Sequence, residues 1–181
     1  MENRKYLEPN KSVIEGCLAG SRKAQFEVYS LYSKAMFNVC MRIVNNTEEA
    51  EDILQEAFLS AFKNIKSYKW EAAFGAWLKR IVVNYSINHI RKRKLEVVSM
   101  EESNPVEKVE ETPPDYELEL TVEKVRNAIQ LLPDGYRVVF SLYLLEGYDH
   151  GEIAEILNIT ESTSKSQYNR AKKKLRELIA A

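Results

Sequence analysis

The chain has 181 residues, which is enough for one medium domain or two small ones, each with a modest core. Its net charge is -1, but residues 1–95 carry +6, residues 96–123 carry -9 and residues 124–181 carry +2. Phosphate binding depends on local basic surface, so the total charge does not exclude a nucleic-acid partner.

Several other classes of protein are excluded. No apolar run could span a bilayer and the N-terminus lacks the apolar core of a signal peptide, so we expect a cytoplasmic protein without membrane insertion. Cys17 and Cys40 have no metal-ligand neighbours and are expected to be buried or half-buried free thiols. His89 and His150 are expected to be solvated or capping residues. We find no catalytic constellation, cofactor loop or metal cluster, so no enzymatic activity, cofactor or metal is expected.

Nearly every periodic segment has the helical period, which predicts an all-α protein. After a lead-in over residues 1–20, apolar residues recur at helical spacing: Phe26, Tyr29, Met36, Phe37, Cys40 and Val44. Asn45-Asn46-Thr47 breaks this pattern, and Thr47 is available to cap a new helix.

The next helix is the clearest in the chain. Its predicted buried stripe consists of Ala50, Ile53, Leu54, Ala57, Phe58, Ala61, Phe62 and Ile65. On a helical wheel, the opposite face carries Asp52, Gln55, Glu56, Leu59 and Lys63. Leu59 is an apolar side chain among polar ones, which indicates a docking patch for another protein, although isolated exposed leucines are common.

A short basic loop, Lys66 to Glu71, follows this helix and has no obvious core to fill. Tyr68 and Trp70 alternate there with lysines, a pattern that suits single-stranded nucleic acid because bases stack on rings and phosphates pair with Lys. The alternative is that both rings fold over the end of the helical core.

A third helix is expected to turn Phe74, Trp77, Leu78, Ile81 and Tyr85 inward. Along a flank bordered by Trp77 lie the polar residues Arg80, Asn84, Asn88 and Arg91. Residues 96–116 then contain three prolines and seven acidic residues, which predicts a flexible acidic linker. Such a run is usually a solvated tether, and the alternative is a mimic of nucleic acid inside a basic channel.

After the linker, residues 117–181 are expected to form a second domain of four helices. Leu132 to Gly135 supplies a turn into a helix from Tyr136 to Leu145. The last two helices have the pattern of a helix-turn-helix: Ile153, Ala154 and Leu157 face inward, Asn158 supplies the turn, and Thr160 can cap the helix that starts at Glu161.

That last helix is predicted to be a recognition helix for a DNA major groove. Its first turns present Ser162, Thr163, Lys165, Ser166, Gln167, Asn169 and Arg170. The alternative is an amphipathic helical hairpin with a solvated charged face.

These segments, taken in order, resemble the bacterial sigma factors of the extracytoplasmic-function (ECF) group over about residues 21–95 and 117–181. Ala50 to Phe58 resembles the family's segment that grips the clamp helices of the largest polymerase subunit. Phe74 to Leu78, with Ile81, Asn84 and the basic run 91–94, resembles the segment that opens and reads the minus-ten element. Leu132 to Arg137, Glu146-Gly147-Tyr148 and the helix-turn-helix resemble the domain for the minus-thirty-five element and the polymerase flap.

The resemblance implies a transcription initiation factor whose partners are core RNA polymerase and promoter DNA. It implies polymerase docking by Asp52, Gln55 and Glu56, with Leu59 as a contact. For the minus-ten element it points to Arg80, Asn84, Asn88 and Arg91, to which the aromatic loop adds Tyr68 and Trp70. The block from Ile65 to Glu71 departs from the family's usual small residues and Gly before the Phe, so the base captured there is open. Arg137, Lys172 and Lys173 join the recognition helix at the minus-thirty-five element as phosphate ligands. An anti-sigma factor is often a further partner in the family, and no residue here demonstrates one.

Three residues depart from the family's usual pattern. Asn158 stands where Gly is usual, Ser164 where Val is common, and Gln167 where Arg is common. Helix packing should survive these changes, but the base preference cannot be copied, because Gln and Arg read different base edges. The runner-up interpretation is an autonomous helix-turn-helix regulator that binds an operator without polymerase. It leaves the acidic face with Leu59 unexplained.

Overall fold

The computed structural model describes residues 8–97 and 121–180, and every regular element in these ranges is helical. This confirms the predicted all-α class. The chain forms two compact units, residues 1–90 and 91–181. The predicted acidic linker lies almost wholly outside the described residues, and the domain boundaries proposed from the sequence stay predictions.

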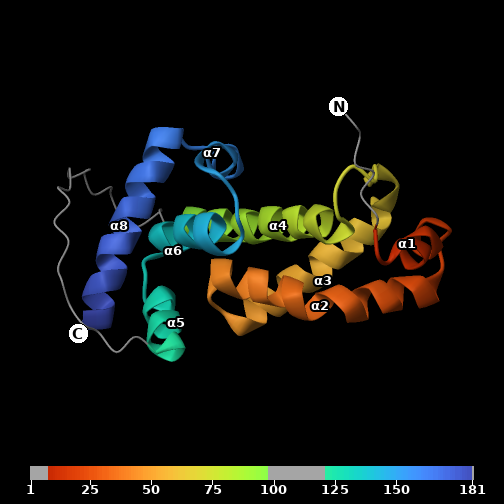
Figure 1. Ribbon diagram of the computed structural model, residues 1–181, viewed down its shortest axis with the longest axis horizontal. Coiled ribbons are helices and arrows are strands. Elements are labelled where there is room, and N and C mark those ends of the chain that lie inside the picture. The colour runs from red at the N-terminus through yellow and green to blue at the C-terminus, as the bar shows by residue number, and fades with distance from the viewer. Residues whose placement is uncertain (1–7, 98–120, 181) are drawn as a thin grey trace. The chain divides into compact units, whose positions relative to one another are not determined.

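The N-terminal unit is built on an antiparallel pair of helices, α2 (Arg22–Val44) and α3 (Thr47–Lys63), which lie side by side (Figure 1). Asn45 ends α2 in the left-handed conformation, with φ 56°. The Asn46 side chain accepts a hydrogen bond from Glu49 N at 3.0 Å. The cap of α3 is therefore Asn46 and not Thr47, because Asn46 has the extended backbone that aims its oxygen at the first turn.

Helix α1 (Lys11–Leu18) lies inside the segment that the sequence suggested was only a lead-in. Its Ile14 and Cys17 are buried, and Cβ on Gly16 would come within 2.8 Å of Ala24 Cβ, so glycine permits the close approach of α1 to α2. The lead-in is thus part of the folded unit.

The buried stripe of α3 agrees with the prediction except at Phe62, which is half-buried: the stripe residues from Ala50 to Ala61 are buried, and Ile65 is buried in the short 3-10 turn Ile65–Ser67. Helix α4 (Phe74–Val97) differs in part. Phe74 and Leu78 are buried as expected, but the stripe continues through Val82, Val83 and Ile87, while Ile81 and Tyr85 are half-buried. Phe26 of α2, which shares the helical spacing of the core, is 73% exposed.

The C-terminal unit contains α5 (Val122–Gln130), α6 (Asp134–Phe140) with a π-helical turn (Ser141–Leu145), α7 (His150–Leu157) and α8 (Glu161–Ala180). Helix α8 packs against α5, α6 and α7 (Figure 1). The core of this unit is formed by Leu132, Phe140 and Ala171, against which Tyr168 and Leu175 pack. The predicted helix from Tyr136 to Leu145 is therefore present, with a π-helical second half.

Candidate nucleic-acid interface

The face of α3 that points away from the core has the composition expected of a docking surface. Asp52, Gln55 and Glu56 are exposed, and Leu59 is 70% exposed among them. We call these four residues the docking face. An acidic helix face with one fully presented leucine can combine charge complementarity with one apolar anchor.

The aromatic loop between α3 and α4 is built around Tyr68. The Tyr68 ring is 5% exposed, and its hydroxyl donates to Ala72 O at 2.7 Å. Its centroid lies 4.9 Å from that of Trp70, 5.3 Å from that of Phe74 and 5.6 Å from that of Trp77. The expectation that the loop has no core to fill is therefore wrong for Tyr68, which folds over the end of the helical core and supports the other rings.

Trp70 has a different environment from Tyr68. It is half-buried, and its φ of 62° is a left-handed backbone that bulky residues rarely adopt. Such a conformation costs about 1–3 kcal/mol and persists only where the surroundings impose it. The Lys11 ammonium lies 6.0 Å from the ring centroid of Trp70. One aromatic side chain is thus held in place at the surface beside a cation.

The polar flank of α4 lies as the sequence predicts. Arg80, Asn84, Asn88 and Arg91 are all exposed, and their spacing keeps them within one side of the helix. Trp77 is half-buried at the border of this flank. Arginine and asparagine side chains in a row can donate hydrogen bonds to phosphates and to base edges.

The helix-turn-helix has the predicted turn and cap. Asn158 ends α7 with φ 55°, and Thr160 Oγ1 accepts from Thr163 N at 3.0 Å at the start of α8. The first helix is fixed by a capping box in which Asp149 accepts from Glu152 N at 2.8 Å and Glu152 accepts from Asp149 N at 2.9 Å. Asp149, and not His150, caps α7.

The predicted recognition residues divide into two groups along α8. The exposed ones are Ser162, Lys165, Ser166, Asn169 and Lys173, and the half-buried ones are Thr163, Gln167, Arg170 and Lys172. Lys165 forms an ion pair with Glu161 at 2.6 Å, and the Lys172 ammonium lies 5.1 Å from the Tyr168 ring centroid. Gln167 Oε1 lies beside Gly135, 3.7 Å from where a Cβ on that glycine would be. The Gln167 side chain is therefore partly packed against Gly135, and it is less available for base contacts than the sequence suggested.

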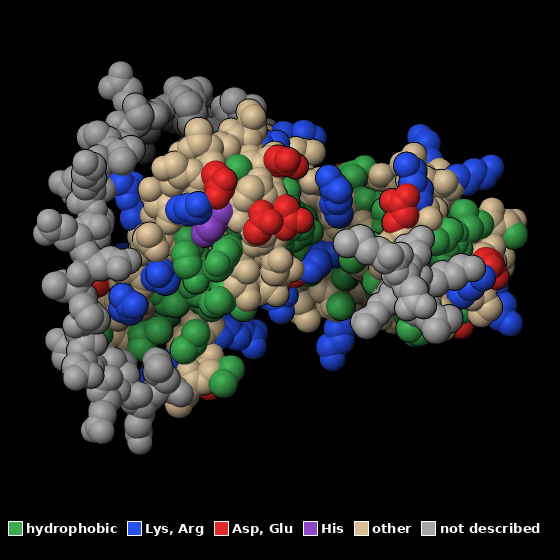
Figure 2. Space-filling view, turned by 45° about the horizontal axis from the view of Figure 1, so that its top comes forward, with side chains coloured by type: hydrophobic (Ala, Val, Ile, Leu, Met, Phe, Trp, Pro, Cys, Tyr) green, Lys and Arg blue, Asp and Glu red, His purple; other side chains and the backbone are tan. Residues whose placement is uncertain are grey.

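Figure 2 shows hydrophobic side chains at the surface of the C-terminal unit, with Lys and Arg side chains around them. The exposed apolar residues of the π-helical turn are Tyr143, Leu144 and Leu145. This unit therefore presents both basic and apolar surface, which one helix-turn-helix can use for DNA and for protein.

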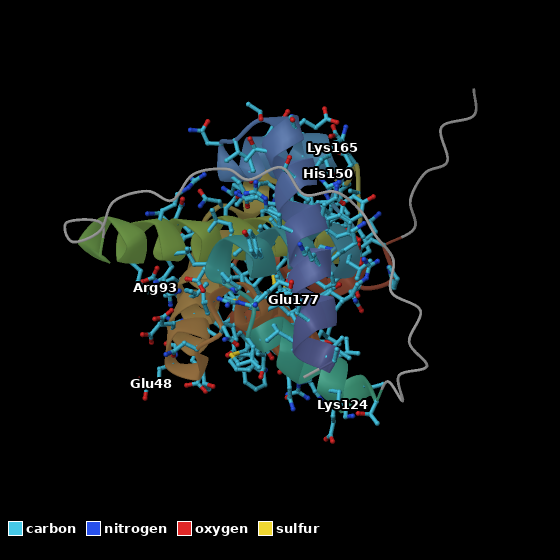
Figure 3. All side chains as sticks on the ribbon, turned by 90° about the vertical axis from the view of Figure 1, so that its left-hand side faces the viewer. Glu48, Arg93, Lys124, His150, Lys165 and Glu177 are labelled. Atoms are coloured by element: carbon cyan, nitrogen blue, oxygen red, sulfur yellow. The ribbon has the colours of Figure 1, made fainter. Side chains whose placement is uncertain are left out.

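Sequence reasoning missed the environment of His150. Its Nδ1 lies 2.9 Å from Ser164 Oγ, and its ring stacks on that of Tyr143 at a centroid distance of 4.4 Å. Figure 3 shows His150 close to Lys165 at the same end of α8. Ser164, which stands where the family commonly has Val, is fully buried, so its hydroxyl needs the partner that His150 supplies.

Arg137 requires a correction. It is buried, donating from Nη1 to Leu132 O at 2.9 Å and from Nη2 to Asp134 Oδ1 at 2.6 Å. Burial acts to raise the pKa of Asp134, but hydrogen bonding and the charge of Arg137 outweigh it and lower the pKa of that carboxyl below its ordinary value. The guanidinium is used to hold the Leu132–Asp134 turn and is not presented to phosphate.

Two further findings concern other kinds of site. Within residues 8–97 and 121–180, we find no group of three or more His, Cys, Asp or Glu residues that could hold a metal ion. None of the helices described is both long and apolar enough to cross a membrane. Cys17 and Cys40 are buried free thiols, as predicted.

Comparisons with known proteins define the class of this all-helical chain as a sigma-70 type transcription initiation factor. The family model described as Sigma-70 region 2 matches residues 28–96, and that described as Sigma-70, region 4 matches residues 122–175. The ECF RNA polymerase sigma factor SigW of Bacillus subtilis (strain 168) is 33% identical over 93% of this chain and 96% of that protein. SigM of the same organism is 30% identical over 84% of this chain and 93% of that protein.

Solved structures agree at the level of the fold. The sigma factor RpoE in complex with the anti-sigma factor NepR, from Bartonella quintana, matches with a TM-score of 0.57 at 24% identity over 86% of this chain and 96% of that one. CnrH in complex with the cytosolic domain of CnrY matches with a TM-score of 0.55 at 18% identity over 94% of this chain and 97% of that one. The chain belongs to the ECF family of RNA polymerase sigma factors, which bind core polymerase and direct it to promoters.

Proposed function

We propose that the docking face of α3 is the surface by which this sigma factor holds core RNA polymerase. The observation that carries the proposal is Leu59, which is 70% exposed one turn from Gln55 and Glu56 on a helix whose opposite side is buried. Asp52, Gln55 and Glu56 add polar contacts around it. A central apolar anchor surrounded by polar groups is the usual arrangement of an energetically important contact.

For the minus-ten element, we propose that an unstacked base of the melted strand stacks on Trp70. Flipping a base costs a few kcal/mol, and stacking on an aromatic ring returns about 1–3 kcal/mol per base. Arg80, Asn84, Asn88 and Arg91 bind the same strand along the flank of α4. The buried ring of Tyr68 packs against Trp70 on the core side, and it is not the ring on which the base stacks.

For the minus-thirty-five element, we propose that α8 enters the major groove. Ser162, Lys165, Ser166 and Asn169 are its exposed candidates for base and phosphate contacts, together with Thr163, Gln167 and Arg170 at its border. Lys172 and Lys173 bind phosphates. Arg137 is left out of this set because its guanidinium is already bonded within the turn before α6.

We also propose that the chain works in the cytoplasm without enzymatic activity of its own, and that an anti-sigma factor controls it. In two structures of similar fold, the sigma factor RpoE is in complex with the anti-sigma factor NepR, and CnrH is in complex with the cytosolic domain of CnrY. Isolation of this chain from its host without any tightly bound inhibitor, under non-inducing conditions, would contradict this control.

The experiment that tests the function is run-off transcription on genomic promoter fragments with core polymerase, with and without this protein, beside a gel shift of the protein alone. We expect promoter-specific transcripts only when both components are present. A strong shift by the protein alone, with no transcripts, would favour the autonomous regulator instead.

A further inference from the structure

The segment that precedes α1 is attached to the start of α4 by a buried carboxylate. Glu8 is 9% exposed, and its Oε2 accepts a hydrogen bond from Phe74 N at 2.8 Å. Its Oε1 lies 3.4 Å from Asn10 N, which donates to it. Residues 8 and 74 are therefore joined directly, although they are 66 positions apart in the chain.

The sequence around α4 explains why this carboxylate is needed. The residues before Phe74 are Ala72 and Ala73, whose side chains carry no oxygen to accept the free N–H groups of the first turn. Helix α4 also has no acidic residue in its first turn. Glu8 supplies both missing features, a hydrogen-bond acceptor and a negative charge at the positive end of the helix dipole.

Two neighbours of Glu8 contact the same site. Asn10 Nδ2 donates to Tyr32 Oη at 3.1 Å, and the Tyr32 ring lies 5.5 Å from that of Phe74. The Lys11 ammonium lies 6.0 Å from the ring centroid of Trp70 and 3.6 Å from Glu15 Oε1, in an exposed ion pair that a phosphate can replace at little cost. Residues 8–11 thus hydrogen-bond to the start of α4 and to Tyr32, and they place a cation beside the aromatic loop.

We propose that residues 8–11, which lie before the part of the chain that matches sigma region 2, are part of the minus-ten site. Glu8 is a positioning residue: by capping α4 it closes the loop that holds Trp70 in its left-handed conformation. Lys11 is a ligand for a phosphate of the strand whose base stacks on Trp70. This inference rests on the proposed role of Trp70.

The experiment measures how strongly permanganate oxidises melted thymines at the minus-ten element, in complexes of the full chain with core polymerase on a promoter found by run-off. Loss of a cap costs about 0.5–2 kcal/mol, so we expect Glu8→Ala to lower the melted fraction by about 2- to 30-fold. Glu8→Gln keeps an acceptor oxygen and should recover part of the loss. Glu27→Ala, on the exposed side of α2, is the control and should match wild type.

Two readouts separate positioning from simple destabilisation. Trp70 and Trp77 are the only tryptophans of the chain, so selectively excited tryptophan fluorescence reports on this loop and the first turn of α4, and we expect a red-shifted, more quenchable emission in Glu8→Ala. The ratio of activities between promoters that differ at one minus-ten base should also change, whereas a destabilised protein loses all promoters equally. Wild-type melting, emission and base ratios in Glu8→Ala would overturn the proposal.

If Glu8→Ala does not fold, the isosteric Glu8→Gln variant decides, and wild-type melting and base ratios in it would overturn the proposal. Trp70→Ala runs in parallel: if it melts the promoter as well as wild type, the role of Trp70 itself fails. If Trp70→Ala is defective and the Glu8 variants are not, only the present inference fails.

Lys11 is tested by the salt dependence of promoter binding. Losing one phosphate contact to single-stranded DNA should reduce the slope of log K against log salt by about 0.7. We expect this reduction for Lys11→Gln and not for Lys23→Gln, which removes an exposed lysine from α2. Equal slopes for the two variants would remove Lys11 from the site.

Discussion

Ser164, a buried residue of the recognition helix, has its hydrogen-bond partner His150 in the helix before it. A hydroxyl buried in an apolar contact is unfavourable unless it is hydrogen-bonded, and His150 Nδ1 lies 2.9 Å from it. The ring also stacks on Tyr143 and meets Tyr168 edge-on, 5.8 Å between centroids. The pair therefore links α7 to α8 at the end of α8 that carries the predicted base-reading residues.

We expect His150→Ala to lower the stability of α7 and α8 by about 1–3 kcal/mol, because it leaves the Ser164 hydroxyl without this partner. In a Ser164→Ala background the same change should cost less, with a coupling of about 1 kcal/mol. Hydrogen exchange of the amides in α7 and α8 measures both. The matched control is His89→Ala, in the other unit, and an identical cost of His150→Ala in both backgrounds would rule out the coupling.

Because the Cys40 thiol is buried, we expect the protein to lose stability at alkaline pH. Burial raises the pKa of its thiol to about 11 from an ordinary value of 9.0, and a hydrogen bond with Ser86 offsets only part of this. Between these two values the folded state keeps a proton that the unfolded state releases, so the free energy of unfolding falls as pH rises, by about 2–3 kcal/mol in all. Urea unfolding at pH 8 to 11 should show a steeper decline in wild type than in Cys40→Ala. If the free energy of unfolding falls equally with pH in both proteins, the role of Cys40 is contradicted.

In helix α3, the residues that stabilise the fold and the residues proposed to bind core polymerase lie on opposite sides of the helix. Its buried side is packed into the unit, whereas Leu59 on the docking face makes little contribution to folding. We expect Leu59→Ala to change the free energy of unfolding by less than about 0.5 kcal/mol and yet to weaken core polymerase binding by about 1–2 kcal/mol. Val122→Ala, which shortens another exposed apolar side chain, should leave binding unchanged. Binding can be measured by fluorescence anisotropy, and equal effects of the two variants would argue against this face.

Helix α8 allows base reading and phosphate binding to be distinguished. Gln167→Ala should change promoter preference by about 1–3 kcal/mol at one base position, whereas Lys173→Ala should weaken all promoters similarly. Binding of holoenzyme to a set of single-base promoter variants measures both. Since Gln167 is half-buried beside Gly135, an equal loss on every base substitution would assign it to the packing of α8 on α6 instead.

At the scale of the whole molecule, the two compact units have separate cores. Phe74, Leu78 and Val82 are fully buried in the first, while Leu132, Phe140 and Ala171 form the core of the second. Both tryptophans lie in the first unit, so their emission follows its unfolding alone, whereas far-ultraviolet circular dichroism follows the helices of both. We expect the two urea transitions to have different midpoints, and coincident transitions would show a single cooperative unit.

The helical class could be predicted from the sequence, because apolar periodicity and turn residues are local properties of the chain. The same is true of the buried stripe and exposed leucine of α3, the left-handed turn at Asn158 and the cap by Thr160. These features depend on residues within a few positions of one another. The order of the motifs was sufficient to indicate the family.

Which polar and aromatic side chains are available at the surface could not be predicted from the sequence and became clear from the packing of the helices. Arg137 and Tyr68 have sequence contexts typical of the surface, yet both are buried. Arg137 donates to Leu132 and Asp134 a few positions before it, and the Tyr68 ring packs on Phe74. The links from Glu8 to Phe74 and from His150 to Ser164 join residues 66 and 14 positions apart. The periodicity of the sequence cannot reveal such pairs, because they depend on how helices pack and on the need of each buried polar group for a partner.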